Sequence, residues 1–123
     1  MFEREPTRLI IGAAIEVHRQ LGPGLLESAY EECLCYELAS AGLAYERQVE
    51  MPLLYKDIEV PACFRADIIV EQSVLLELKS VERLVAIHEA QLLTYLRFSG
   101  LRVGLLLNFN TRAMKDGILR RVL

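Results

Sequence analysis

The sequence predicts an α/β domain in which a central mixed β-sheet is flanked by helices, in the order α-α-β-β-β-α-β-β. Three observations support this prediction: two stretches of helical periodicity come first, apolar runs of strand length follow, and a further helical stretch precedes the last two strands. A strand, a helix and a buried strand in succession imply a crossover, and so parallel or mixed pairing.

Two helices are expected in the first third of the chain. Apolar side chains from Leu9 to Leu21 recur at helical spacing, and Thr7 can cap this helix at its start. Gly22 suits the left-handed position at which a helix ends. The second helix is expected at about Leu26–Ala41, where one stripe of side chains is apolar and another is acidic.

The rest of the chain predicts strands and one more helix. Alternating and continuous apolar runs mark the strands, and a 3.6-residue period marks the helix. In chain order, these elements are an extended pair at Tyr45–Val60 with a turn at Lys56-Asp57, a hairpin of Cys63–Val70 and Val74–Ser80, a helix at Leu84–Ser99 ended by Gly100, a buried strand at Arg102–Asn108, and a last strand at Gly117–Leu123.

The composition is that of a folded domain. The chain has 123 residues, of which 53% are hydrophobic and 25% charged, so we expect residues 1–123 to form one domain around one core. No apolar run is long enough to cross a bilayer and the start is unlike a signal peptide, so a cytoplasmic protein without a membrane partner is expected. The cysteines fit neither a disulfide framework nor a common zinc pattern, and we interpret them as reduced, mostly buried thiols: Cys33, Cys35 and Cys63.

Charge is distributed unevenly along the chain. The net charge is −3, yet from Lys79 onward 8 Lys and Arg residues stand against 3 Asp and Glu residues. A basic region can attract phosphate even when the whole chain is acidic. The alternative is ordinary solvated surface charge.

Three charged side chains interrupt the otherwise apolar hairpin: Asp67, Glu77 and Lys79. Glu77 and Lys79 are two residues apart, so on a strand they point to the same face. Two carboxylates on one face would suit a hard divalent cation such as Mg²⁺. The alternative is a half-exposed strand whose polar residues face water, although Asp67 fits that interpretation less well.

The position of Asp67 depends on the loop that joins the two strands. An odd-length loop centred on Gln72 would place Asp67 directly opposite Glu77. A two-residue loop would instead place Asp67 opposite Leu76, on the wrong face. The metal hypothesis therefore carries a geometric condition.

Three motifs, taken together and in order, resemble one nuclease family. Asp67 and Glu77-x-Lys79, separated by nine residues, resemble the D…(D/E)-x-K core of the PD-(D/E)XK nuclease superfamily, with Ala66 where the superfamily name has Pro. Gly24-Leu-Leu-Glu27-Ser-Ala-Tyr30 resembles the motif of its GxxExxY family. His88-Glu-Ala-Gln91-Leu-Leu-Thr-Tyr95 resembles the helix that follows the core in that family. The likeness spans roughly Leu9 to Val122 and implies a restriction-endonuclease-like core.

The resemblance implies a nuclease that cleaves DNA, with RNA as the alternative substrate, and that uses Mg²⁺ or Mn²⁺. The implied metal ligands are the carboxylates of Asp67, Glu77 and Glu27 and the backbone carbonyl of Leu78. Lys79 would orient the attacking water or stabilise charge on the phosphate oxygens. The alternative function is an inactive nuclease-fold module that binds nucleic acid or a protein partner, and a homodimer is a further expectation for so small a domain.

The helical residues of the motifs have weaker assignments. Gln91 would hydrogen-bond a metal-bound water or a phosphate, and Tyr95 would hold Gln91 or Lys79 from the same helix face. The alternative is that Gln91 and Tyr95 form only a polar edge on an otherwise buried helix. His88 would contact phosphate or simply lie at the surface. Glu27 could instead be a first-turn residue that favours the helix dipole. Tyr30 is expected to be a packing or hydrogen-bonding partner of Glu27.

Overall fold

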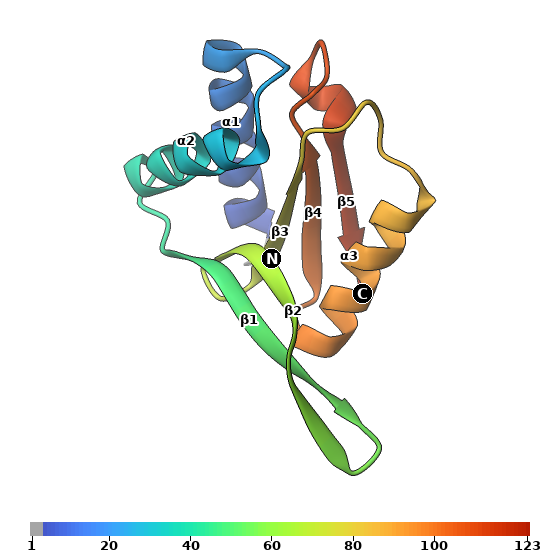
Figure 1. The fold of residues 1–123 in the computed structure, drawn as a ribbon. Coiled ribbons are helices and arrows are strands. Elements are labelled where there is room, and N and C mark those ends of the chain that lie inside the picture. The colour runs from blue at the N-terminus through green and yellow to red at the C-terminus, as the bar shows by residue number, and fades with distance from the viewer. Residues whose placement is uncertain (1–3) are drawn as a thin grey trace.

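The computed structural model describes residues 4–123, with side chains from Pro6 onward, as a five-stranded sheet with helices on both faces (Figure 1). This is the predicted restriction-endonuclease-like α/β arrangement, with one short 3₁₀ helix added before the last strand. The elements in chain order are α1 (Arg4–Leu21), α2 (Glu27–Ser40), β1 (Tyr45–Tyr55), β2 (Ile58–Val70), β3 (Val74–Lys79), α3 (Ala86–Ser99), β4 (Val103–Asn108), η1 (Met114–Gly117) and β5 (Ile118–Val122).

The sheet is mixed, and its strand order follows the chain order, β1-β2-β3-β4-β5. Hairpin connections give antiparallel pairing between β1 and β2, between β2 and β3, and between β4 and β5. β3 and β4 are parallel, because α3 carries the chain back across the sheet between them. The mixed pairing that the strand–helix–strand pattern predicts is therefore confirmed.

Two apolar cores lie on opposite faces of the sheet. On one face, α1 and α2 cover side chains such as Leu76 and Leu105. On the other face, Leu92 and Leu96 of α3 pack against Leu75 and its neighbours. Since alternate residues of a strand face opposite sides, Glu77 and Lys79 share the α3 face with Leu75.

Helix α3 approaches β4 closely because Gly104 has no side chain. A Cβ at this position would lie 2.8 Å from Cδ1 of Leu92 and 3.2 Å from the terminal carbons of Leu96. The left-handed backbone of Gly100, with a φ of 79°, ends the helix as expected. This packing fixes the helix that carries Gln91 and Tyr95.

The expected start of the first helix was wrong. α1 begins at Arg4, so Thr7 lies inside the helix and is buried, and it does not cap the N-terminus. Pro6 falls in the first turn, where a proline costs no intrahelical hydrogen bond. Met1–Glu3 lie outside the described residues.

The strand boundaries also differ from expectation in one place. The residues from Ile58 to Val70 form a single long strand, in which Pro61–Cys63 bulge opposite Pro52. The β1–β2 hairpin, with its turn at Lys56-Asp57, extends beyond the rest of the molecule (Figure 1). On this hairpin Cys63 is exposed, whereas Cys35 is buried as expected. Within residues 4–123, no helix combines the length and the apolar character needed to span a membrane.

Candidate functional site

β2 and β3 are joined by a three-residue loop, which is the odd length that the carboxylate alignment requires. The loop is centred on Gln72, whose backbone is left-handed with a φ of 54°. The last pair of the ladder is Ile68 with Leu76, so the next residues, Asp67 and Glu77, lie opposite each other. The geometric condition of the metal hypothesis is met.

The two strands part at this point, and carboxylates replace the missing ladder partners. β3 continues beside β4 as far as Lys79, but no β2–β3 pair follows Ile68–Leu76. The backbone N–H of Asp67 donates to Oε2 of Glu77 at 3.1 Å. The N–H of Leu78 donates to Oδ2 of Asp67 at 2.8 Å. Each carboxylate thus satisfies a backbone donor that the fork leaves without a strand partner.

Burial raises the pKa of both carboxyl groups. Burial first, and then the charge of Asp67, raise the pKa of Glu77 to about 8. Burial is also the main cause of the raised pKa of Asp67, although the N–H of Leu78 acts in the opposite direction and the charges of Glu31 and Glu27 add to the rise. A bound cation would relieve the cost of holding two ionised carboxylates together here.

Lys79 is held by α3 through a chain of polar side chains. Its Nζ donates to Oε1 of Gln91 at 3.1 Å, and Nε2 of Gln91 donates to the hydroxyl of Tyr95 at 3.1 Å. The ring of Tyr95 stacks on Phe64 of β2, with 4.5 Å between ring centroids. The structure therefore brings Lys79, Gln91 and Tyr95 together beside the carboxylate pair.

The carboxylate pair offers free oxygens to a cation. Oδ1 of Asp67 and Oε1 of Glu77 accept no hydrogen bond from the described part of the chain. Carboxylate oxygens are the ligands that Mg²⁺ and Mn²⁺ prefer, so these two residues fit such an ion. The backbone carbonyl of Leu78 stays a predicted ligand.

Glu27 is not gathered into a full cluster with the pair. Among residues 4–123, no three His, Cys, Asp or Glu side chains are arranged to hold a metal. Glu27 is exposed in the first turn of α2, where the helix dipole favours it. Its charge nevertheless adds to the raised pKa values of Asp67 and Glu77, so it lies within electrostatic range of the pair. Its part in binding a metal stays a prediction.

The hydroxyl of Tyr30 does not bond Glu27, so the expected hydrogen bond between them was wrong, whereas packing between them stays a prediction. The hydroxyl of Tyr30 instead donates to the carbonyl of Gly22 at 2.6 Å and accepts from the N–H of Leu25 at 3.1 Å. Its fully buried ring stacks on Phe109 with 4.6 Å between centroids. Tyr30 therefore holds the loop that leads into α2, because a buried hydroxyl bonds the nearest backbone groups.

His88 occupies the start of α3. Its ring Nδ1 accepts a hydrogen bond from the backbone N–H of Val85 at 3.1 Å, and its backbone N–H donates to the carbonyl of Val85 at 2.9 Å. These bonds satisfy backbone groups at the helix N-terminus. In this position His88 caps a helix, and a phosphate contact from it is still only a prediction.

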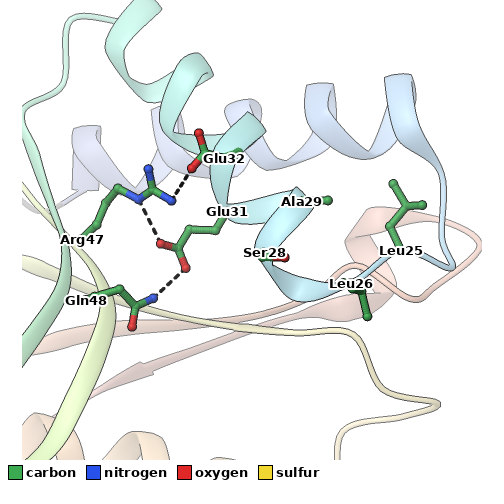
Figure 2. A pocket seen from close by; sticks show the side chains of 8 residues that line it. All are labelled: Leu25, Leu26, Ser28, Ala29, Glu31, Glu32, Arg47 and Gln48. Carbon is green, nitrogen blue, oxygen red and sulfur yellow. Dashed lines mark hydrogen bonds and ion pairs between the residues drawn. The ribbon is translucent and has the colours of Figure 1, made fainter.

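Sequence reasoning missed a polar cluster that lies between α2 and β1. It is formed by Glu31, Arg47 and Gln48, which line an open pocket of about 560 Å³ together with Glu32 and apolar residues of the preceding loop (Figure 2). Glu31 belongs to the acidic stripe that the sequence predicts for the second helix, but that stripe gives it no partner. No local signal marks the cluster, since its members come from elements that are distant along the chain.

Asn108 at the end of β4 was also missed. Its side chain is buried, and it bonds both the N–H and the carbonyl of Val81 at 3.0 Å. The N–H of Asn110 donates to Oδ1 of Asn108, which also accepts from the N–H of Val81. Asn108 therefore fixes the segment that directly follows Lys79.

Comparison with known proteins gives one match. A family model described as the PD-(D/E)XK nuclease superfamily matches residues 4–122, from the first residue of α1 to the last residue of β5. No curated protein and no solved structure matches the chain. The matched span contains the carboxylate pair and Lys79.

Proposed function

Because the chain belongs to the PD-(D/E)XK nuclease superfamily, we propose that it is a metal-dependent phosphodiesterase that cleaves DNA, with RNA as the alternative substrate. Within the superfamily we assign it to the GxxExxY family, on the motif residues Gly24, Glu27 and Tyr30. The excess of basic residues from Lys79 onward supports a polyanionic substrate. We further propose a cytoplasmic location and a homodimer, which gel filtration with light scattering would test.

The observation that carries this proposal is the gathering of Asp67, Glu77 and Lys79 at the fork between β2 and β3. Asp67 and Glu77 would hold Mg²⁺ or Mn²⁺, with the carbonyl of Leu78 as a further ligand and Glu27 bound directly or through water. When bound, such a cation supplies a water of lowered pKa and polarises the scissile phosphate.

The side chains around the pair would act on the substrate itself. The ammonium of Lys79 would orient the attacking water or stabilise the negative charge that develops on the phosphate oxygens. Gln91 would hold Lys79 in place or hydrogen-bond the phosphate, and Tyr95 would fix the amide of Gln91. The backbone bonds to Asp67 and Glu77 keep the two carboxylates in place before substrate arrives.

A cleavage assay with matched variants tests the proposal. Circular and linear duplex DNA, single-stranded DNA and RNA would be incubated with the protein in Mg²⁺, Mn²⁺ or EDTA. We expect metal-dependent cleavage that falls by about 100-fold or more in Lys79→Ala and Asp67→Ala. Lys56→Ala, which removes an exposed lysine of the β1–β2 turn outside the basic region, should cleave like the unaltered chain. Cleavage that survives both site substitutions would overturn the assignment.

One observation favours a second function, a nuclease-fold module that binds nucleic acid or a protein partner without cutting. Among the described residues, no third His, Cys, Asp or Glu side chain joins Asp67 and Glu77 in an arrangement that could hold a metal. Calorimetric titration with Mg²⁺ separates the two functions. Nucleic-acid binding without any heat of Mg²⁺ binding at millimolar concentration would favour the inactive module.

A further inference from the structure

Gln48 of β1 lies across the ladder from Asp67 of β2. The ladder keeps one register on both sides of this position, as the neighbouring pairs show: Arg47–Ile68 and Val49–Ala66. The backbone of Gln48 is left-handed, with a φ of 51°. Residues other than glycine rarely adopt this conformation, so it persists only where other contacts hold it.

Both strands change face at this point. Tyr45 packs against the core under α1 and α2, whereas Val49 packs against the core under α3, although a regular strand would keep both on one face. In β2, Ile68 and Ala66 are divided between the two cores in the same way. Asp67 stands at the turning point, so the direction of its side chain depends on how the switch is held.

The cluster seen in Figure 2 holds the β1 side of the switch. Oε1 of Glu31 accepts from Nε2 of Gln48 at 2.8 Å, and Oε2 accepts from Nε of Arg47 at 2.9 Å. The side chain of Glu31 is only 10% exposed, so losing either partner would be costly. A second nitrogen of Arg47 bonds the exposed Glu32 at 2.6 Å.

We propose that Glu31, Arg47 and Gln48 form a clamp of positioning residues, which holds the face switch of β1 and thereby fixes Asp67 toward Glu77. Both oxygens of Glu31 are occupied by the clamp itself, so its proposed effect on the site runs through the position of Asp67. The inference deepens the proposed function, because the pair that the clamp orients is the pair proposed to hold the cation.

Hydrogen exchange in the metal-free protein tests the clamp directly. The N–H of Leu78 donates to Asp67, so its exchange rate reports whether Asp67 keeps its place. In Glu31→Ala we expect Leu78 to exchange about tenfold faster, with no change at the core amide of Leu105. Glu32→Gln, which alters only the exposed partner of Arg47, should leave both rates unchanged.

Further variants keep the test decisive. Gln48→Ala removes one arm of the clamp and leaves the Glu31–Arg47 pair. It should therefore raise the exchange rate of the Leu78 amide, and it provides the test if Glu31→Ala does not fold. Glu31→Gln keeps an acceptor for Gln48 and should restore part of the protection. The clamp is refuted if the exchange rate of the Leu78 amide is unchanged in folded variants, or if the exchange rate of the Leu105 amide rises by the same factor.

Calorimetric titration with Mn²⁺ measures the consequence for the site. Outer partners of metal ligands typically change affinity by about 10–100-fold, and we expect at least about tenfold weaker binding in Glu31→Ala. Glu32→Gln should bind like the unaltered chain, and equal affinity in all three proteins would overturn the link to the cation. If the unaltered chain binds no Mn²⁺, the proposed function fails. The exchange rate of the Leu78 amide in the metal-free protein would still show whether the clamp holds Asp67.

Discussion

The backbone N–H of Asp67 donates a hydrogen bond to the carboxylate of Glu77, 3.1 Å away on the neighbouring strand. The link places two acidic side chains side by side where they are partly shielded from water. The protonation of the pair is therefore coupled to folding, and it would also be coupled to the proposed cation binding.

The stability of the metal-free protein should depend on the protonation of Glu77. The pKa of Glu77 is about 8 in the folded chain, against an ordinary value of 4.5. The folded state therefore holds this proton more tightly than the unfolded state, and the free energy of unfolding should fall as pH rises from 4.5 to about 8. Glu77→Gln removes the loss of stability that ionisation of Glu77 causes. At pH ~9 this variant should therefore melt at a higher temperature than the unaltered chain, and at pH ~5 the difference in melting temperature should be smaller.

Thermal melts in EDTA at the two pH values measure the effect. Glu59→Gln, a substitution at an exposed residue of β2, serves as the control and should show no such dependence. A difference in melting temperature between Glu77→Gln and the unaltered chain that is the same at both pH values would contradict the prediction.

Mn²⁺ should stabilise the folded chain through Asp67. A ligand that binds only the folded state at about 100 times its Kd adds about 2.7 kcal/mol to the free energy of unfolding. We expect the melting temperature to rise with Mn²⁺, to return to its original value in EDTA, and to stay unchanged in Asp67→Asn. Asp57→Asn, in the exposed hairpin turn, should respond like the unaltered chain. An equal rise in Asp67→Asn would place the ion elsewhere.

Tyr95→Phe should slow cleavage without unfolding the protein. The substitution removes the hydroxyl that accepts from Gln91, but it keeps the ring that stacks on Phe64. Losing one neutral hydrogen bond corresponds to about 0.5–1.5 kcal/mol, so kcat should fall by about 2–10-fold. Kinetics at saturating Mn²⁺ together with thermal melts would test this, with Tyr36→Phe on the exposed face of α2 as the control. An unchanged kcat would remove Tyr95 from the proposed support of Lys79.

Tyr30→Phe should reduce stability and leave metal affinity nearly unchanged. It deletes the hydrogen bonds to Gly22 and Leu25 and retains the stack on Phe109. A buried backbone group left without a partner costs about 1–3 kcal/mol, which urea denaturation would detect as a lower midpoint. A loss of Mn²⁺ affinity with unchanged stability would instead support the original expectation that Tyr30 serves Glu27.

The sequence was sufficient to predict most of the fold, and it reduced the alignment of the carboxylates to one condition, the length of the loop between β2 and β3, which the structure decided. Apolar periodicity locates the helices and strands, and the loop around Gln72 determines which residue faces Glu77. These features depend on local sequence, where each residue restricts its near neighbours. The start of α1 was misjudged because Thr7 is of a type that commonly caps helices, whereas Pro6 is tolerated in a first turn and lets the helix begin at Arg4.

Contacts between distant segments could not be predicted in the same way. Glu31 and Gln48 are 17 residues apart and lie on different elements, so only the tertiary arrangement joins them. The left-handed backbone of Gln48 has no sequence signal either, because glutamine rarely adopts it. Tyr30 was misassigned for a related reason, since the motif gives its spacing from Glu27 but not the direction of its hydroxyl.

The sequential strand order has a consequence for how the protein folds. Three of the four strand pairings are hairpins, which can form from neighbouring segments, whereas β3 and β4 meet only across the α3 connection. We expect β1–β2 amides to become protected before those of β3–β4 during refolding, and pulse-labelled hydrogen exchange would reveal the reverse order if this is wrong. Lys79 lies at the end of the late pairing, opposite Asn108, so the chain would become competent for chemistry only as its slowest contacts close.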